Sequence, residues 1–139
     1  MLLIGDLLDF LKELSGTNKI DASSDLFLDV GLVGDDFHEM IEKYSKRYSV
    51  DMAGYLWYFH ADEEGQSIGG LFFKPPYRQV DRIPVTPTML LDFANKGKWD
   101  MLYPNHEIAP RRYDLLINKI ILTGIATLIV VVLLNKYLR

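Results

Sequence analysis

Apolar residues recur at helical spacing in the first fifty residues of the chain. Residues 2 to 15 carry an inward stripe of six apolar side chains: Leu3, Leu7, Leu8, Phe10, Leu11 and Leu14. Residues 35 to 48 carry a second stripe: Phe37, Met40, Ile41, Tyr44 and Tyr48. Apolar positions three and four residues apart lie on one face of an α-helix. The pattern therefore predicts two amphipathic helices.

A third helix is predicted over residues 86 to 96. Thr86 is a good N-cap residue, Pro87 suits the first helical position, and Gly97 marks the end of the helix. The side chains expected to face inward are Met89, Leu90, Phe93 and Ala94. Trp99 follows directly and is expected to pack back on the domain.

The residues between the second and third helices form a less regular pattern. We expect a short aromatic helix over residues 55 to 59 and a short strand or hairpin over the apolar run 68 to 73. The Pro75–Pro76 pair prevents any continuation of such a strand. We expect a solvated loop around His60, Asp62, Glu63 and Glu64, and a surface position for His106.

The C-terminal segment has a different composition. Residues 120 to 134 contain no charge and are rich in Ile, Leu and Val. With the apolar residues on either side, the stretch reaches about 24 residues, long enough as a helix for a hydrocarbon core of about 30 Å. The pattern predicts one transmembrane helix that includes Ile120, Gly124, Leu128 and Val132. A buried core helix is the alternative, although so small a domain offers little to cover it.

The flanks of the predicted span indicate its orientation. Arg111, Arg112 and Lys119 precede the span, whereas Lys136 and Arg139 follow it. This excess of positive charge favours a cytoplasmic N-terminal domain and a tail-anchored protein. The first 16 residues lack a basic region and are interrupted by acids, so we expect a folded helix there rather than an export signal.

Charge and cysteine content narrow the chemistry. The chain of 139 residues has a formal net charge of -4 and no basic stripe, which argues against a nucleic-acid partner. It has no cysteine, so disulfides, thiolate zinc sites and cysteine nucleophiles are excluded. No motif typical of a hydrolase or nucleotide-binding enzyme is present. We expect no catalytic residue, no cofactor and no metal.

The stretch "LDVGLVGDDFHEMIEKY", residues 28 to 44, resembles the loop and second helix of acyl carrier proteins. In that family a serine at the start of this helix takes 4′-phosphopantetheine. Asp29, Val30 and Gly31 match the triplet that precedes the helix, and Asp36 stands at the serine position. The resemblance implies a small helical bundle without the residue that receives the prosthetic group.

A closer resemblance is to DUF1493, a family of small bacterial proteins without an established activity. It rests on residues 26 to 55 with their Gly-Asp-Asp, and on "VTPTMLLDFANKGKW" at residues 85 to 99. The resemblance covers most of residues 1 to 103, and the C-terminal span is an addition. A bacterial source implies the inner membrane as the location of that span.

The acids at the start of the second helix are the candidate interaction site. One interpretation is that Asp35 and Asp36 cap the helix through backbone N–H groups. The other, compatible with the first, is an electrostatic docking surface for a protein partner that is basic or membrane-associated, formed by Asp35, Asp36, His38, Glu39 and Glu42.

Two alternatives remain open for this region. A carrier could be modified on a different serine: Ser23, Ser24, Ser45 or Ser49. A small acidic metal-binding or sensor domain could use Asp29, Asp35, Asp36 and His38, although the ligand order of an EF-hand is missing.

The sequence as a whole predicts a mainly α protein. We expect an acyl-carrier-like helical core over residues 1–64, a short irregular or β insertion over 65–84 and a closing helix over 85–103. A linker over 104–112 and a transmembrane helix over 113–139 follow. The expected function is a non-catalytic, membrane-tethered adaptor that binds the lipid bilayer through its C-terminal helix and a protein partner through its acidic second helix.

Overall fold

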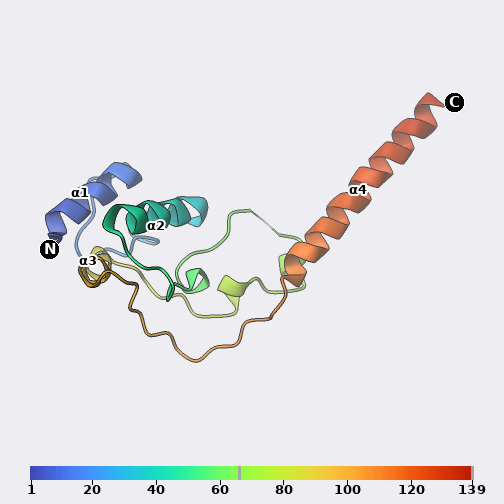
Figure 1. The fold of residues 1–139 in the computed structure, drawn as a ribbon. Coiled ribbons are helices and arrows are strands. Elements are labelled where there is room, and N and C mark those ends of the chain that lie inside the picture. The colour runs from blue at the N-terminus through green and yellow to red at the C-terminus, as the bar shows by residue number, and fades with distance from the viewer. Residues whose placement is uncertain (66, 139) are drawn as a thin grey trace.

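The computed structural model describes residues 1–65 and 67–138, so the predicted flank residue Arg139 lies outside the described residues. Helices α1 (Ile4–Ser15), α2 (Gly34–Tyr48) and α3 (Pro87–Lys96) form the body of the protein. Between α2 and α3 lie three short 3-10 helices, η1 (Trp57–Phe59), η2 (Gly69–Leu71) and η3 (Pro76–Arg78). Helix α4 (Tyr113–Tyr137) projects from the body (Figure 1). The chain is mainly helical, and the described residues contain no sheet.

The core is formed by the predicted faces of α1 and α2. Leu7, Phe10 and Leu11 of α1 are buried. The buried apolar side chains of α2 are Phe37, Met40, Ile41 and Tyr44. Leu3, expected to face inward, is 60% exposed, because the helix begins at Ile4, two residues later than predicted, and Leu3 is its extended N-cap.

Helix α3 closes this core. The Thr86 hydroxyl accepts a hydrogen bond from the Met89 N–H at 3.3 Å, which confirms the predicted N-cap. The Tyr44 hydroxyl donates a hydrogen bond to the Leu90 carbonyl oxygen at 2.6 Å and links α2 to α3. Gly97 ends the helix with a left-handed backbone, φ +72°, and returns the chain toward the core.

The residues after α3 join it to the end of α2. Trp99 is 3% exposed, as predicted, and its backbone N–H donates to the Asp51 carbonyl oxygen at 2.8 Å. The Asp51 N–H in turn donates to the Gly97 carbonyl oxygen at 2.9 Å. These two bonds form an isolated parallel bridge. Core packing is therefore completed by residues that lie about fifty positions later in the chain.

The strand or hairpin predicted over residues 68 to 73 is not present. The run instead contains η2, whose first residue, Gly69, packs against the backbone of α4. A Cβ atom at Gly69 would lie 1.9 Å from the Asp114 carbonyl oxygen. This contact with a distant segment, rather than the apolar pattern, determines the local conformation. Outside η2 and η3, residues 67–84 have no regular secondary structure.

Helix α4 is 25 residues long and contains an 18-residue window with a mean hydropathy of 2.4, none of it buried. By length and composition it could cross a membrane. Its predicted span residues Ile120, Gly124, Leu128 and Val132 are all exposed. The alternative of a buried core helix is wrong, because the body does not cover this helix.

An ion-pair cluster joins the body to the start of α4. The Arg112 guanidinium donates to both carboxylate oxygens of Glu63, at 3.0 and 2.7 Å, and to those of Asp114, at 2.9 and 2.7 Å. Asp114 is only 2% exposed. The hydrogen bonds to Asp114, and then those to Glu63, raise the pKa of Arg112. Glu63 is thus part of a structural link and not of a solvated loop as predicted.

Candidate functional site

The start of α2 places Asp36 on the surface at the position that the resemblance assigned to a serine. The N-cap residue is Val33, whose apolar side chain makes no capping hydrogen bond. Asp35 and Asp36 are exposed, and the Asp36 N–H donates to the Val33 carbonyl oxygen at 3.2 Å. The prediction that these two carboxylates cap the helix by hydrogen bonding is wrong. They remain in the first turn, where the helix dipole favours negative charge.

The cap comes from a distant segment. The Asp62 carboxylate accepts a hydrogen bond from the Gly34 N–H at 3.0 Å. Gly34 has a left-handed backbone, φ +51°, and a Cβ atom there would lie 2.1 Å from Cγ of Glu64. Residues 62 to 64 therefore cover the helix start, and of the predicted solvated loop only Glu64 is exposed. The signal missed in the sequence was an Asp that could act as an N-cap from 28 residues away.

His38 lies on the same turn but is turned toward this covering segment. Its Nε2 atom is 3.1 Å from the Asp62 carbonyl oxygen, and its ring meets Trp57 edge-on at 5.6 Å. A carbonyl oxygen only accepts hydrogen bonds, so Nε2 carries the proton and donates. The imidazole thus helps to hold Asp62 in place.

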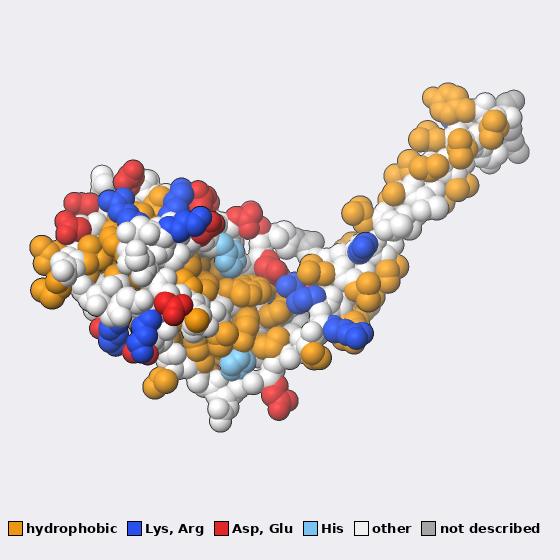
Figure 2. Space-filling view, viewed as in Figure 1, with side chains coloured by type: hydrophobic (Ala, Val, Ile, Leu, Met, Phe, Trp, Pro, Cys, Tyr) orange, Lys and Arg blue, Asp and Glu red, His pale blue; other side chains and the backbone are white. Residues whose placement is uncertain are grey.

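Glu39 and Glu42 are exposed on α2, and each is paired with a lysine one turn later. The Glu39 carboxylate lies 2.6 Å from the Lys43 ammonium, and Glu42 contacts Lys46. The hydrogen bond from Lys46 lowers the pKa of Glu42. These pairs offset their own charge, so the net negative charge of α2 is concentrated at Asp35 and Asp36. Figure 2 shows acidic side chains gathered over this end of the helix.

A small hollow of about 130 Å³ lies beside Asp36, between α1, the loop before α2 and α2 itself. Its lining includes Gly31, Leu32, Asp36 and Glu39. The polar residues of the lining are Asp36, Glu39, Lys43 and Ser15. Lys43 is paired with Glu39, and the Ser15 hydroxyl donates to the Leu11 carbonyl oxygen, so Asp36 is the carboxylate of the hollow that an external cationic group could reach.

His60 is the residue whose position departs most from its prediction. It is fully buried, and burial lowers its pKa to about 4. Its Nδ1–H donates to the Ile83 carbonyl oxygen at 2.9 Å. Its Nε2 accepts from the Tyr103 hydroxyl at 2.8 Å. Since the Tyr103 oxygen already accepts from Leu56 N–H and Trp99 Nε1–H, its own proton must go to His60.

The Tyr103 bond therefore fixes His60 in its neutral tautomer. A proton on His60 Nε2 would have no acceptor, because both lone pairs of the Tyr103 hydroxyl oxygen already accept hydrogen bonds from Leu56 and Trp99. The residue acts as a structural link between residues 60, 83 and 103 and is not available as a base. Sequence patterns reveal only a histidine near acids, because its partner Tyr103 lies 43 residues away.

The serines of the carrier alternative lie outside the start of α2. The Ser24 hydroxyl accepts from the Asp21 N–H at 2.9 Å, and the Ser45 hydroxyl donates to the Glu42 carbonyl oxygen at 2.9 Å. Ser23 is exposed in the loop, and Ser49 is the left-handed residue after α2. None of them occupies the position of Asp36.

The four residues of the metal alternative do not converge. One oxygen of Asp29 accepts from the Asp25 N–H at 2.8 Å, and His38 faces Asp62. Over residues 1–65 and 67–138, no three His, Cys, Asp or Glu side chains form a group able to hold a metal ion.

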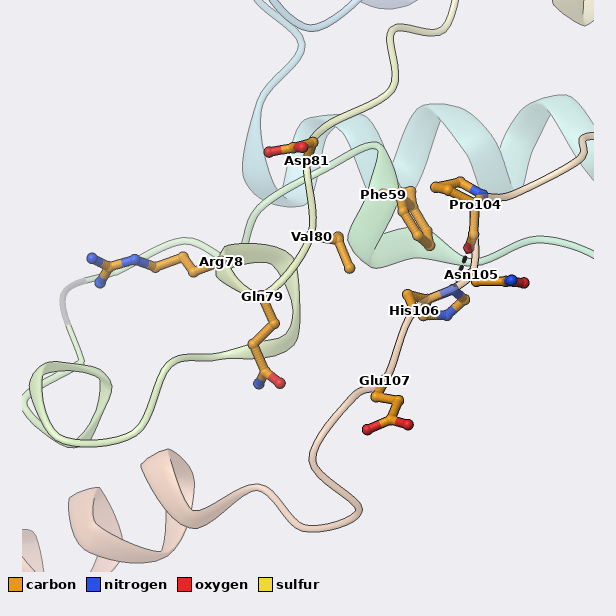
Figure 3. A pocket seen from close by; sticks show the side chains of 9 residues that line it. All are labelled: Phe59, Arg78, Gln79, Val80, Asp81, Pro104, Asn105, His106 and Glu107. Carbon is orange, nitrogen blue, oxygen red and sulfur yellow. Dashed lines mark hydrogen bonds between the residues drawn. The ribbon is translucent and has the colours of Figure 1, made fainter.

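A separate hollow of about 370 Å³ lies between residues 78 to 81 and 104 to 107. His106 is on the surface, as predicted, and its Nε2 accepts from the Tyr58 hydroxyl at 2.9 Å. Figure 3 shows that the side chains of Arg78, Asp81 and Glu107 point in different directions and do not converge on one point. Their arrangement gives no acid–base pair.

The fold and the site define a class of small, mainly helical proteins with an acidic helix start and a long apolar C-terminal helix. The chain belongs to the family described as "Protein of unknown function (DUF1493)", whose model matches residues 6–103. Neither a search of curated proteins nor a search of solved structures found a match. The family match covers α1 from Asp6 onward, α2, α3 and Trp99, and ends before α4.

Proposed function

We propose that this protein is a non-catalytic, membrane-tethered interaction module of the acyl-carrier type that lacks the phosphopantetheine serine. In this proposal, α1, α2, η1 and α3 correspond to the helices of a carrier domain. Asp36 replaces the modified hydroxyl with a permanent negative charge. The protein recognises a basic surface of a protein partner and transfers no group.

The observation that carries the proposal is the state of the α2 start. Its Gly34 N–H is bonded to Asp62, while the Asp35 and Asp36 carboxylates are exposed. Among the described residues, neither carboxylate has an ion-pair partner. The two charges are therefore available to an external cation. Charges of this kind guide association and select partners.

The tether in this proposal is α4, crossing a bacterial inner membrane once. The basic residues at its body end, Arg111, Arg112 and Lys119, favour a cytoplasmic body by the positive-inside rule. Tethering confines the body to a thin layer beside the bilayer and raises its effective concentration toward other membrane proteins. A weak interface then suffices.

The test is capture of partners from solubilised membranes with the full chain carrying Asp36→Lys. The wild type is expected to retain a partner that Asp36→Lys and Asp35→Lys both lose. Asp9→Lys reverses an exposed acid on α1, one that is paired with Lys12, and is expected to retain the partner. A partner list that is identical for all four proteins would overturn the proposal.

Intact mass of the purified chain provides an independent test. After co-expression with a phosphopantetheinyl transferase, the mass is expected to equal that of the unmodified polypeptide. A gain equal to one phosphopantetheine group would show a carrier that uses another serine. That result would contradict the non-carrier proposal directly.

A further inference from the structure

Four large apolar side chains lie exposed on the segment that contains η2. Ile68 is 52% exposed, Leu71 79%, Phe72 71% and Phe73 45%. Four exposed apolar side chains within six residues are unusual for a surface in contact with water alone and mark a place of contact. We name residues 68–73 the apolar loop.

The apolar loop is fixed to the first turns of α4 by specific bonds. The Gly69 N–H donates to the Asn118 side-chain oxygen at 2.8 Å, and the Asn118 amide donates to the Ser67 hydroxyl at 2.7 Å. The Phe73 ring lies 5.4 Å from the Tyr113 ring. Because Gly69 has no Cβ, its backbone approaches the Asp114 carbonyl oxygen directly. Figure 1 shows η2 at the base of α4.

These bonds fix the position of the apolar loop along the axis of α4. Asn118 is five residues after Tyr113, about 7 Å along the helix axis. The uncharged stretch begins two residues later, at Ile120. The apolar loop is therefore beside the end of the apolar stretch, where a spanning helix passes from acyl chains to headgroups.

The charges around the apolar loop suit a lipid surface. The acids at the base of α4, Glu63 and Asp114, are both bonded to Arg112. Three exposed cations lie near this region in the sequence: Lys74 directly after the apolar loop, Arg111 just before α4 and Lys119 within α4. Figure 2 shows basic side chains at the base of α4. Exposed cations beside apolar side chains match the headgroups and acyl boundary of an anionic membrane.

We propose that the apolar loop inserts into the membrane interface beside α4 and binds lipid. The body then has two attachments, the spanning helix and the loop, so it is held against the bilayer in one orientation. This inference rests on the part of the proposed function in which α4 crosses a membrane. It does not depend on the acids of α2.

Single-cysteine variants of the full chain test this proposal, since the protein has no cysteine of its own. An environment-sensitive fluorophore is attached at Leu71→Cys or Phe72→Cys. The protein is reconstituted in vesicles of phosphatidylcholine and phosphatidylglycerol, with and without a lipid-borne quencher. Matched controls are Leu28→Cys and Leu102→Cys, apolar positions that are 68% and 95% exposed on the body. Leu128→Cys reports on α4.

We expect blue-shifted emission and loss of intensity to the quencher at positions 71, 72 and 128, and neither effect at 28 and 102. If positions 71 and 72 behave like 28 while 128 is quenched, the loop proposal is wrong and the span stands. If position 128 is also unquenched, the membrane tether itself fails. Blue-shifted emission at 71 and 72 without quenching would mean a protein contact and would likewise overturn the proposal.

A second variant tests the bond between the loop and the helix. Gly69→Ala places a Cβ atom against the Asp114 carbonyl oxygen and is expected to reduce quenching at position 72. Gly70→Ala is the control, because its Cβ would lie 3.3 Å from Ser67 Oγ, 3.4 Å from Ser67 Cβ and 3.7 Å from Pro75 Cδ and would not touch the backbone of α4. Equal loss of quenching in both variants would contradict a specific role of the Gly69 contact.

Discussion

The Asp62 carboxylate caps α2 at Gly34 through a 3.0 Å hydrogen bond between residues that are 28 positions apart. This bond makes the helix start depend on tertiary structure. We expect Asp62→Ala to lower the free energy of unfolding by about 1 kcal/mol, because the Gly34 N–H loses its acceptor. Urea unfolding of the full chain in detergent measures it, with Trp57 and Trp99 reporting on the body.

Two variants separate the hydrogen bond from charge at this position. Asp62→Asn keeps an N-cap acceptor and is expected to retain most of the stability. Asp35→Ala removes an exposed acid of the same turn without removing a cap. If Asp35→Ala were the more destabilising change, the dipole interaction and not the Asp62 bond would dominate.

Gly34→Ala should destabilise the packing of residues 62 to 64 against the start of α2. An alanine must adopt φ +51° there, which costs about 1 kcal/mol, and its Cβ meets Glu64 Cγ at 2.1 Å. Adding Glu64→Ala to Gly34→Ala should restore the part of the unfolding free energy that is lost through the contact between Cβ and Glu64. The part lost because alanine must adopt a left-handed backbone should remain. The double variant in the same unfolding assay checks this, and no recovery would exclude the Glu64 contact as a cause.

The stability of the body should fall in mild acid because of His60. The pKa of His60 is about 4 in the folded protein and 6.5 as the ordinary value. Below pH 6.5 the unfolded chain therefore binds a proton that the folded chain does not bind until about pH 4. This difference in proton binding lowers the free energy of unfolding by roughly 3 kcal/mol as the pH falls from 6.5 to about 4.

Proton NMR of the His60 ring checks the assignment directly. We expect its ring signals to stay constant from pH 7 to about pH 5 while the protein remains folded. Urea unfolding over the same range should give a free energy of unfolding that decreases with acidification. A ring that titrates near pH 6.5 in the folded protein would refute the explanation.

Tyr44→Phe should destabilise the protein by about 1 to 3 kcal/mol, because it leaves the buried Leu90 carbonyl without the bond from the hydroxyl. Tyr48→Phe is the matched control on the same helix. Tyr48 is only half-buried, and its hydroxyl makes no bond of this kind to α3. Similar losses in both variants, measured by thermal unfolding, would show that ring packing and not the hydroxyl links α2 to α3.

The helices could be predicted because their signals are local. The apolar stripe of α2 and the Thr86 cap of α3 each depend on residues within one or two turns. The cap of α2 could not be predicted in the same way. Its acceptor, Asp62, comes from a segment whose path is fixed by His38 and Trp57 through packing.

The irregular region shows a second limit of sequence patterns. The apolar run at residues 68 to 73 suits a strand, but Gly69 packs on the Asp114 backbone and the run turns instead. His60 next to three acids suggests a solvated loop, yet Tyr103 and Ile83 enclose it. In both cases the deciding partner lies more than twenty residues away, where periodicity carries no information.

The parallel bridge between Asp51 and Lys98 has a consequence for biosynthesis. A nascent polypeptide cannot complete its interior until Trp99 has left the ribosome, and translation reaches that tryptophan before it reaches the first residue of α4. Under the proposal that α4 crosses a membrane, the body can therefore fold before α4 enters the bilayer. Mutations that delay the packing of Trp99 would then leave the body incompletely folded at the time of insertion.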